Sequence, residues 1–212
     1  MTATVVVRGR GTVEVEPDAA VLVAEARARA IDPSAAHAAA AGIASAVDEL
    51  LDRAGAAVRR RSTSALLVTP SYEWRDNARQ FVGFDAVRSS TIEIVDSGSI
   101  GDIFAGLASV RANAGNLRWV IDRDNPAHAE ARRLAATDAR GRASSYAEAL
   151  GVGLGPVQEI REPETRSPGG PQPEGRMYAM AADAGGGSDS MEVSAPTLTV
   201  ASEVEVTFSI TP

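Results

Sequence analysis

The sequence predicts an α+β protein, built mainly of antiparallel sheets with helices packed on one face. Three observations indicate this class. Several segments alternate apolar and polar side chains with the two-residue period of a strand, and others repeat apolar residues at helical spacing. These segments follow one another in the order ββαββ–αβαββ. We expect a first half over residues 1–96 and a second half over residues 97–212, with a flexible insertion at about 166–190.

Two strands are predicted at the start of the chain. Residues 5–15 and 22–29 each alternate in the manner of a strand with one buried face. Gly9 and Gly11 flank Arg10 inside the first of these strands. Two glycines at such a place indicate either a β-bulge or the close approach of another backbone segment.

A helix is expected over residues 33–54. Asp32 suits the N-cap, Pro33 suits the first helical position, and Gly55 is typical of a helix end. The apolar positions at helical spacing predict a buried face. That face consists of Ala36, Ala39, Ile43, Val47, Leu50 and Ala54.

A long β-hairpin is predicted to complete the first half, with its tip at residues 74–79. Tyr72, Trp74 and Phe81 gather around this tip. An exposed tryptophan is unfavourable unless something covers it, so these side chains either fold back on the sheet or anchor a neighbouring subunit. The three aromatic residues are therefore the candidate interface of the chain, with both alternatives open.

The second half is predicted to hold two helices and three strands. Ser99 suits the cap of a short helix that buries Ile100, Ile103, Phe104 and Leu107, and a strand follows at residues 116–121. A long helix begins at Asn125 and ends at Gly151. We expect its inward side to consist of Ala131, Leu134, Ala135, Ala139, Ala143, Tyr146, Ala147 and Leu150. Strands around residue 157 and at 200–210 flank the insertion, which is rich in glycine and proline.

Composition excludes several functional classes. The formal net charge is −7, and a nucleic-acid-binding protein normally has a basic face, so we expect no nucleic-acid partner. The chain has no lysine and no cysteine, which removes Schiff-base, thiolate and cysteine–metal chemistry. The only basic run is Arg59–Arg61, which fits a solvated strand edge or, alternatively, a contact with an anion or partner.

We predict no catalytic, cofactor or metal site. His37 and His128 are the only histidines, and they do not form a zinc-binding spacing. The acidic stretch at residues 122–125 lacks the glycine and the distal glutamate of a calcium loop, and helix capping by Asn125 explains it more simply. A Ser–His–Asp triad assembles in space rather than in sequence, so it stays an open alternative.

The whole order resembles the SIMPL domain family, formerly a domain of unknown function. The resemblance rests on residues 9–18, 63–72, 83–84, 138–151, 154–155, 177–180 and 204–210. It implies a mostly bacterial protein, often periplasmic or associated with the outer membrane and linked to oxidative-stress defence. It also implies ring-like or hollow multi-subunit assemblies in some members. No accepted set of catalytic residues comes with the family.

The leading hypothesis is a non-catalytic protein that forms a homo-oligomer, because long strands leave sheet edges that must be covered, charged or paired. One alternative is a ligand-binding or hydrolytic protein with a cleft between its two halves, and another is an adaptor for a different protein. No stretch has the length and apolarity of a transmembrane helix. We expect a cytoplasmic location for the chain as written, and a periplasmic one if a leader has been removed.

Overall fold

The computed structural model describes residues 3–75, 77–163 and 193–211. Its mostly antiparallel strands and its helices confirm the α+β class. The described strands and helices also follow the predicted order, with two additional short strands, β3 (Val58–Thr63) and β6 (Asn113–Ala114). The expected insertion at 166–190 lies outside the described residues.

The described residues divide into two compact units. The first contains residues 3–17, 121–163 and 196–211, and the second contains residues 18–75, 77–120 and 193–195. The boundary expected between residues 96 and 97 falls inside the second unit. The reason is that the first strand of the chain pairs with the last one, so both ends of the chain belong to one sheet.

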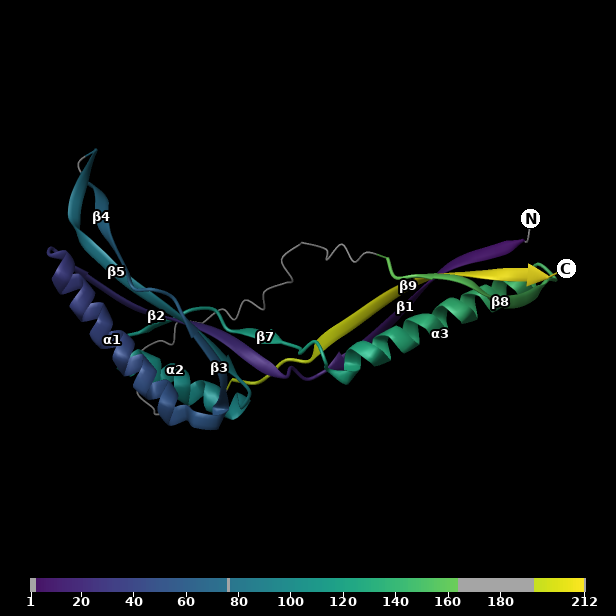
Figure 1. The fold of residues 1–212 in the computed structure, drawn as a ribbon, viewed down its shortest axis with the longest axis horizontal. Coiled ribbons are helices and arrows are strands. Elements are labelled where there is room, and N and C mark those ends of the chain that lie inside the picture. The colour runs from purple at the N-terminus through teal and green to yellow at the C-terminus, as the bar shows by residue number, and fades with distance from the viewer. Residues whose placement is uncertain (1–2, 76, 164–192, 212) are drawn as a thin grey trace, which may run out of the picture. The chain divides into compact units, whose positions relative to one another are not determined.

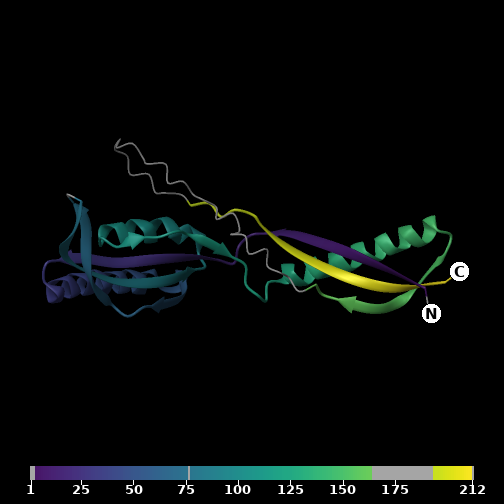
Figure 2. The same cartoon turned by 90° about the horizontal axis from the view of Figure 1, so that it is seen from above.

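The first unit is a helix on an antiparallel sheet. Its described strands lie in the order β1 (Thr4–Val15), β9 (Leu198–Thr211) and β8 (Gly153–Arg161). Helix α3 (Pro126–Ala149) packs mainly on β1 and β9. Figure 2 shows β9 in yellow between β1 in purple and β8 in green, with α3 running alongside.

Glycine and alanine let α3 lie very close to β1. A Cβ atom at Gly9 would lie 2.0 Å from the Ala135 carbonyl oxygen, and one at Gly11 would lie 2.1 Å from the Ala131 carbonyl oxygen. The pairing of β1 with β9 runs without a register shift from Thr4 to Val15. Of the two explanations for the glycines, the close backbone approach is therefore correct and the bulge is not.

The buried side of α3 is a row of alanines at every fourth position. These are Ala127, Ala131, Ala135, Ala139, Ala143 and Ala147. The prediction that Tyr146 and Leu150 point inward is wrong, because they are 59% and 72% exposed. They flank the alanine row, and only a methyl group fits between the helix and the sheet. Asn125 caps the helix as predicted, and its side chain accepts a hydrogen bond from the Ala127 N–H.

The second unit contains a larger sheet. Its described strands run in the order β3, β5 (Ala78–Ile94), β2 (Ala19–Ala30) and β6, while β4 (Leu67–Arg75) pairs with β5 and β7 (Arg118–Val120) pairs with β2. Helices α1 (Pro33–Ala54) and α2 (Ile100–Ser109) share one core with this sheet. Short 3₁₀ turns, Gly55–Ala57 and Ser97–Ser99, follow α1 and precede α2.

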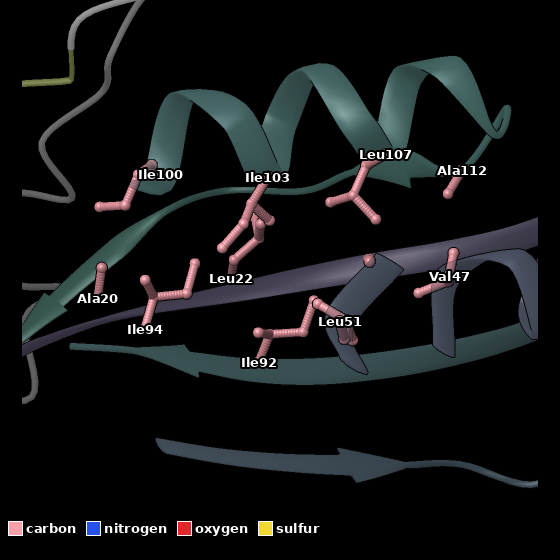
Figure 3. Packing of buried hydrophobic residues seen from close by; sticks show 11 residues of the cluster. Ala20, Leu22, Val47, Leu51, Ile92, Ile94, Ile100, Ile103, Leu107 and Ala112 are labelled. Atoms are coloured by element: carbon pink, nitrogen blue, oxygen red, sulfur yellow. The ribbon is translucent and has the colours of Figure 1, made fainter. Parts of the chain in front are cut away.

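The core of the second unit is made of bulkier side chains. Leu22 and Ile92 from the sheet meet Leu51 of α1 and both Ile103 and Leu107 of α2 (Figure 3). All five are at most 3% exposed. Trp119, predicted to be part of the core, packs against this cluster from β7. The unit therefore gains its stability from burying branched apolar side chains.

Two details of the helices differ from the prediction. On α1 the buried line includes Ala40, Ala44 and Leu51 at steps of three or four residues, and Ala39 lies outside this line and is exposed. Asp32 caps α1 as expected by accepting a hydrogen bond from the Ala35 N–H. Ser99 precedes α2 but makes no capping hydrogen bond; its hydroxyl donates to the Asp96 carboxylate.

Candidate interaction surface

The β4–β5 hairpin reaches beyond the strand that anchors it. Strand β5 pairs with β4 from Ala78 to Val87, but its pairing with β2 ends at Phe84, opposite Ala30. The outer part of the hairpin therefore has only two strands (Figure 1). Two-stranded ribbons bury little surface of their own, so their side chains stay available for contacts.

Local sequence explains the shape of the hairpin. Asn77 takes a positive φ of 61° at the turn, a conformation that asparagine tolerates better than most residues. The register shifts by one residue between Ser71 and Tyr72. Gly83, with φ of 127°, has no side chain because a Cβ atom there would lie 2.6 Å from the Ala30 carbonyl oxygen. The tight crossing at the end of β2 thus requires glycine.

The predicted aromatic residues lie on one face of this hairpin, because Tyr72 is opposite Phe81 and Trp74 is two residues from Tyr72 on β4. Tyr72 contacts Phe81 edge to face at a centroid distance of 5.7 Å, and Phe81 contacts Phe84 at 5.3 Å. The Arg79 guanidinium carbon lies 4.2 Å from the centroid of the Tyr72 ring. We call Tyr72, Trp74 and Phe81 the aromatic hairpin surface.

The aromatic hairpin surface is open to solvent. Tyr72 is 44% exposed, Trp74 is 71% exposed and Phe81 is 47% exposed. Trp74 does not fold back on the sheet, whereas Phe81 leans on the half-buried Phe84. An apolar cluster that is exposed in this way is typical of a protein-binding surface.

The opposite face of the hairpin carries charges that fasten it to β2. The Arg29 guanidinium binds both oxygens of Asp85, with Nε–Oδ1 and Nη2–Oδ2 distances of 2.8 Å and 3.0 Å. It also reaches Glu73 on β4 at 3.0 Å, and Arg75 binds the same Glu73 at 2.7 Å. The planar guanidinium of Arg29 on β2 thus binds carboxylates of two other strands, β4 and β5, and fixes the orientation of the hairpin.

These ion pairs shift the acidity of the groups involved. The hydrogen bond from Arg29 lowers the pKa of Asp85 to about 2, with a further contribution from the Ser71 hydroxyl. The pKa of Glu73 is also lowered, mainly by Arg75. The pKa of Arg29 is raised, chiefly by its hydrogen bond to Asp85. Both carboxylates are therefore ionised at neutral pH, and the charged face stays intact.

The other candidate residues do not come together as a site. His37 is exposed on α1, and the His128 ring Nε2 lies 3.0 Å from the Asp122 carbonyl oxygen near the start of α3. Within the residues that the structure describes, no three histidine, aspartate or glutamate side chains are grouped so as to hold a metal ion.

The basic run lies on β3, at the edge of the described sheet. Arg59 and Arg60 pair with Glu93 of the neighbouring strand β5, and Arg61 pairs with Asp52 of α1 at 2.8 Å. These arginines border a shallow, open hollow beside Gly55. The solvated strand edge expected from the sequence describes them well, since each cation already faces a carboxylate.

Sequence reasoning missed part of the exposed apolar surface. Val157 and Ile160 on β8 are 47% and 66% exposed, although their apolar character in a strand suggested burial. The sequence signal that could have indicated this exposure is the row of small residues on α3, the helix that precedes β8 in the chain. A helix that presses its alanines on β1 and β9 leaves the third strand uncovered.

Comparison with known proteins gives the family. The family described as "SIMPL: Protein of unknown function (DUF541)" matches residues 5–208. The chain belongs to the SIMPL family. The resemblance seen in the sequence is thereby confirmed, and the family description states no activity.

Two curated relatives of this SIMPL chain carry names that state no enzymatic activity. The chain is 29% identical over 210 residues to the uncharacterized protein YggE of Edwardsiella ictaluri, covering 97% of this chain and 86% of that protein. It is 28% identical over 166 residues to the 26 kDa periplasmic immunogenic protein of Brucella melitensis, covering 76% of this chain and 66% of that protein.

A solved structure also overlaps with part of the chain. It is a hydantoinase/carbamoylase family amidase from Burkholderia ambifaria, with a TM-score of 0.23 and 13% identity, covering 52% of this chain and 27% of that one. An overlap of this extent carries no argument about fold or activity. None of the helices in the described part of the SIMPL chain has the length and apolarity needed to span a bilayer.

Proposed function

We propose that this SIMPL protein is non-catalytic and assembles with copies of itself through the aromatic hairpin surface. The observation that supports this proposal is the exposure of Trp74, at 71%, beside the half-exposed Tyr72 and Phe81. Tryptophan and tyrosine provide large contact areas with few rotatable bonds, and they are enriched among the residues that dominate protein–protein binding.

A second copy is the partner that the family resemblance favours, since it implies multi-subunit assemblies in some members. The geometry suits such a contact. The charged network of Arg29, Glu73 and Asp85 holds the hairpin from one face and leaves the aromatic face free. A surface that is rigid before binding loses less conformational entropy on association.

The test is a double substitution, Tyr72→Ala with Trp74→Ala, followed by light scattering during gel filtration. We expect the native mass to fall towards that of the single chain, because both anchors are lost. The matched control is Tyr146→Ala with Leu150→Ala, which removes two exposed side chains from α3 and leaves the mass unchanged. Circular dichroism shows whether each variant is folded. A native mass that is the same for the folded hairpin variant and the unsubstituted chain contradicts the proposal.

The proposal also covers the cellular location of the protein and its biological process. The Brucella relatives are named periplasmic proteins, which favours the periplasmic alternative over the cytoplasmic one. Cell fractionation distinguishes the two. The stress-related role implied by the family, the cleft between the two halves and the adaptor role each stay predictions.

A further inference from the structure

The three-stranded sheet of the first unit has two outer strands in the described chain, β1 and β8, and they differ in how they are protected. At the outer side of β1 the backbone N–H of Arg10 donates to the Asp138 carboxylate of α3 at 2.9 Å. A second copy of β1 would therefore have to displace this carboxylate, and the Arg8 and Arg10 side chains of β1 already pair with Glu205 and Glu203 of β9. Strand β1 is therefore poorly suited to pair with its own copy.

Strand β8 has the opposite properties. Helix α3 covers mainly β1 and β9, and it leaves Val157 and Ile160 of β8 47% and 66% exposed. Figure 2 shows β8 at the side of the sheet away from β1. An uncovered strand edge with exposed apolar side chains is a template for pairing with another strand, and in β8 these apolar side chains are Val157 and Ile160.

The register shows which backbone groups of β8 point outward. The Ile210 N–H donates to the Ala3 carbonyl, so by alternation Val206 also turns its backbone N–H and C=O towards β1. Ile160 lies opposite Val206 on the other side of β9. The N–H and C=O of Ile160 consequently point away from the sheet, in the direction from which a further strand would approach.

The charges beside Ile160 are self-complementary. Glu159 precedes Ile160 and Arg161 follows it, and within one chain these two side chains pair at 2.8 Å. If two β8 strands run antiparallel with Ile160 opposite Ile160, each Glu159 faces the Arg161 of the other copy. The two Ile160 side chains then lie next to each other on the face that also carries α3.

We propose that β8 is a second self-association site, at which two copies pair antiparallel about a two-fold axis through Ile160. The two three-stranded sheets become one continuous sheet, and each Ile160 exchanges a pair of backbone hydrogen bonds with its counterpart. This inference rests on the proposed self-assembly but uses a different surface from the hairpin. A contact of this size is weak alone and gains strength when a second interface holds the same copies together.

The direct test is disulfide cross-linking of the Ile160→Cys variant. The natural chain has no cysteine, so a disulfide can form only between two copies. Directly opposed residues of a hydrogen-bonded antiparallel pair have Cα atoms about 5.5 Å apart, which lies within the range of a disulfide. We expect mild oxidation to yield a covalent dimer. Leu150→Cys, at a site that is 72% exposed on α3, is the control for random collisions. A dimer yield for Ile160→Cys no higher than that of the control overturns the proposal.

Charge reversal tests the register. Glu159→Arg places arginine opposite Arg161 of the other copy twice, and we expect the β8 contact to weaken by about tenfold, equivalent to ~1.4 kcal/mol. Adding Arg161→Glu restores opposite charges and should restore association. Glu130→Arg, which breaks the exposed pair with Arg133, makes the same change in net charge as a control. Failure of the double reversal to restore association contradicts this register.

The two self-association proposals fail independently. If Ile160→Cys forms dimers while the Tyr72 and Trp74 substitutions leave the native mass unchanged, the hairpin proposal is wrong and the β8 proposal stands. If the hairpin substitutions lower the mass while Ile160→Cys does not form dimers beyond the control, the reverse holds.

Discussion

The two units cover an antiparallel sheet with helices in different ways. In the first unit α3 presents only alanine methyl groups, and Gly9 and Gly11 let its backbone approach β1. In the second unit α2 and the C-terminal half of α1 present leucine, isoleucine and valine, which fill the space against the sheet (Figure 3), whereas the first half of α1 packs through alanines. One layered architecture can therefore be stabilised either by close backbone contact or by side-chain bulk.

The difference determines how each unit fails. A close backbone contact has no room for an added atom, so the first unit is sensitive to larger residues. A core of branched side chains loses most when atoms are removed, because a cavity remains. We therefore expect substitutions that add atoms to destabilise the first unit most, and substitutions that remove atoms to destabilise the second unit most.

The largest effect is expected from Gly9→Val. The added side chain would overlap the Ala135 carbonyl oxygen and the Ala139 nitrogen, both of which belong to helix backbone. We expect a loss of about 5 kcal/mol or more in the free energy of unfolding of the first unit. Urea unfolding followed by circular dichroism measures it.

The matched control is Gly141→Ala on the outer side of α3, where an added Cβ atom meets nothing within 4 Å. Alanine should stabilise that helix by roughly 0.5–1 kcal/mol. Equal stability of the Gly9→Val variant and the unsubstituted chain would mean that α3 does not lie against β1 as described.

A smaller effect is expected from Leu107→Ala in the second unit. Leu107 is fully buried between α2 and the sheet, so its truncation leaves a cavity and should lower the unfolding free energy by about 3 kcal/mol. Leu150→Ala removes the same atoms from a side chain that is 72% exposed, and it should change stability by less than about 1 kcal/mol. Similar losses for both leucines would contradict the core assigned to the second unit.

The smallest effect concerns the charged face behind the hairpin. The pKa of Asp85 is lowered to about 2 in the folded chain, below its unfolded value of about 3.9. A lowered carboxylate pKa stabilises the fold above the unfolded value, and this contribution is lost as the pH falls from about 4 through 2. Asp85→Asn should therefore unfold more readily than the unsubstituted chain at pH 7, with the difference shrinking towards pH 2. Thermal melts across this pH range measure it, and a difference that is independent of pH would exclude the ion pair as its cause.

Sequence reasoning predicted the local elements better than their packing. Asp32 and Asn125 mark helix starts through hydrogen bonds within a few residues, so their sequence context sufficed. The exposure of Tyr146 and Leu150 depends on how closely α3 lies to β1, which is a contact between residues more than 100 positions apart. Periodicity alone cannot distinguish the buried line of such a helix from its flank.

Part of the candidate site could likewise be predicted from the sequence, and part of it could not. Tyr72, Trp74 and Phe81 could be selected from the sequence because they cluster at a predicted hairpin tip. Their common face follows from the register that sets Tyr72 opposite Phe81, and the register shift between Ser71 and Tyr72 brings Phe84 to the same face. The sequence reveals neither. Ile160 was missed altogether, since its exposure follows from the position of α3 on a sheet formed by both ends of the chain.

The two proposed surfaces lie in different units of one chain. The aromatic hairpin surface belongs to the second unit, and the β8 edge belongs to the first. A chain with two distinct self-association sites can build assemblies larger than a dimer, because each copy has a second surface available after the first is occupied. A chain with a single two-fold symmetric site would form only a dimer.

The native mass of the unsubstituted protein in solution tests self-assembly most directly. One chain has a mass of 21.9 kDa. We expect light scattering or native mass spectrometry to detect, at micromolar concentration, a species whose mass is a whole-number multiple of this value and exceeds that of two chains. A mass of one chain throughout the micromolar range would contradict self-assembly.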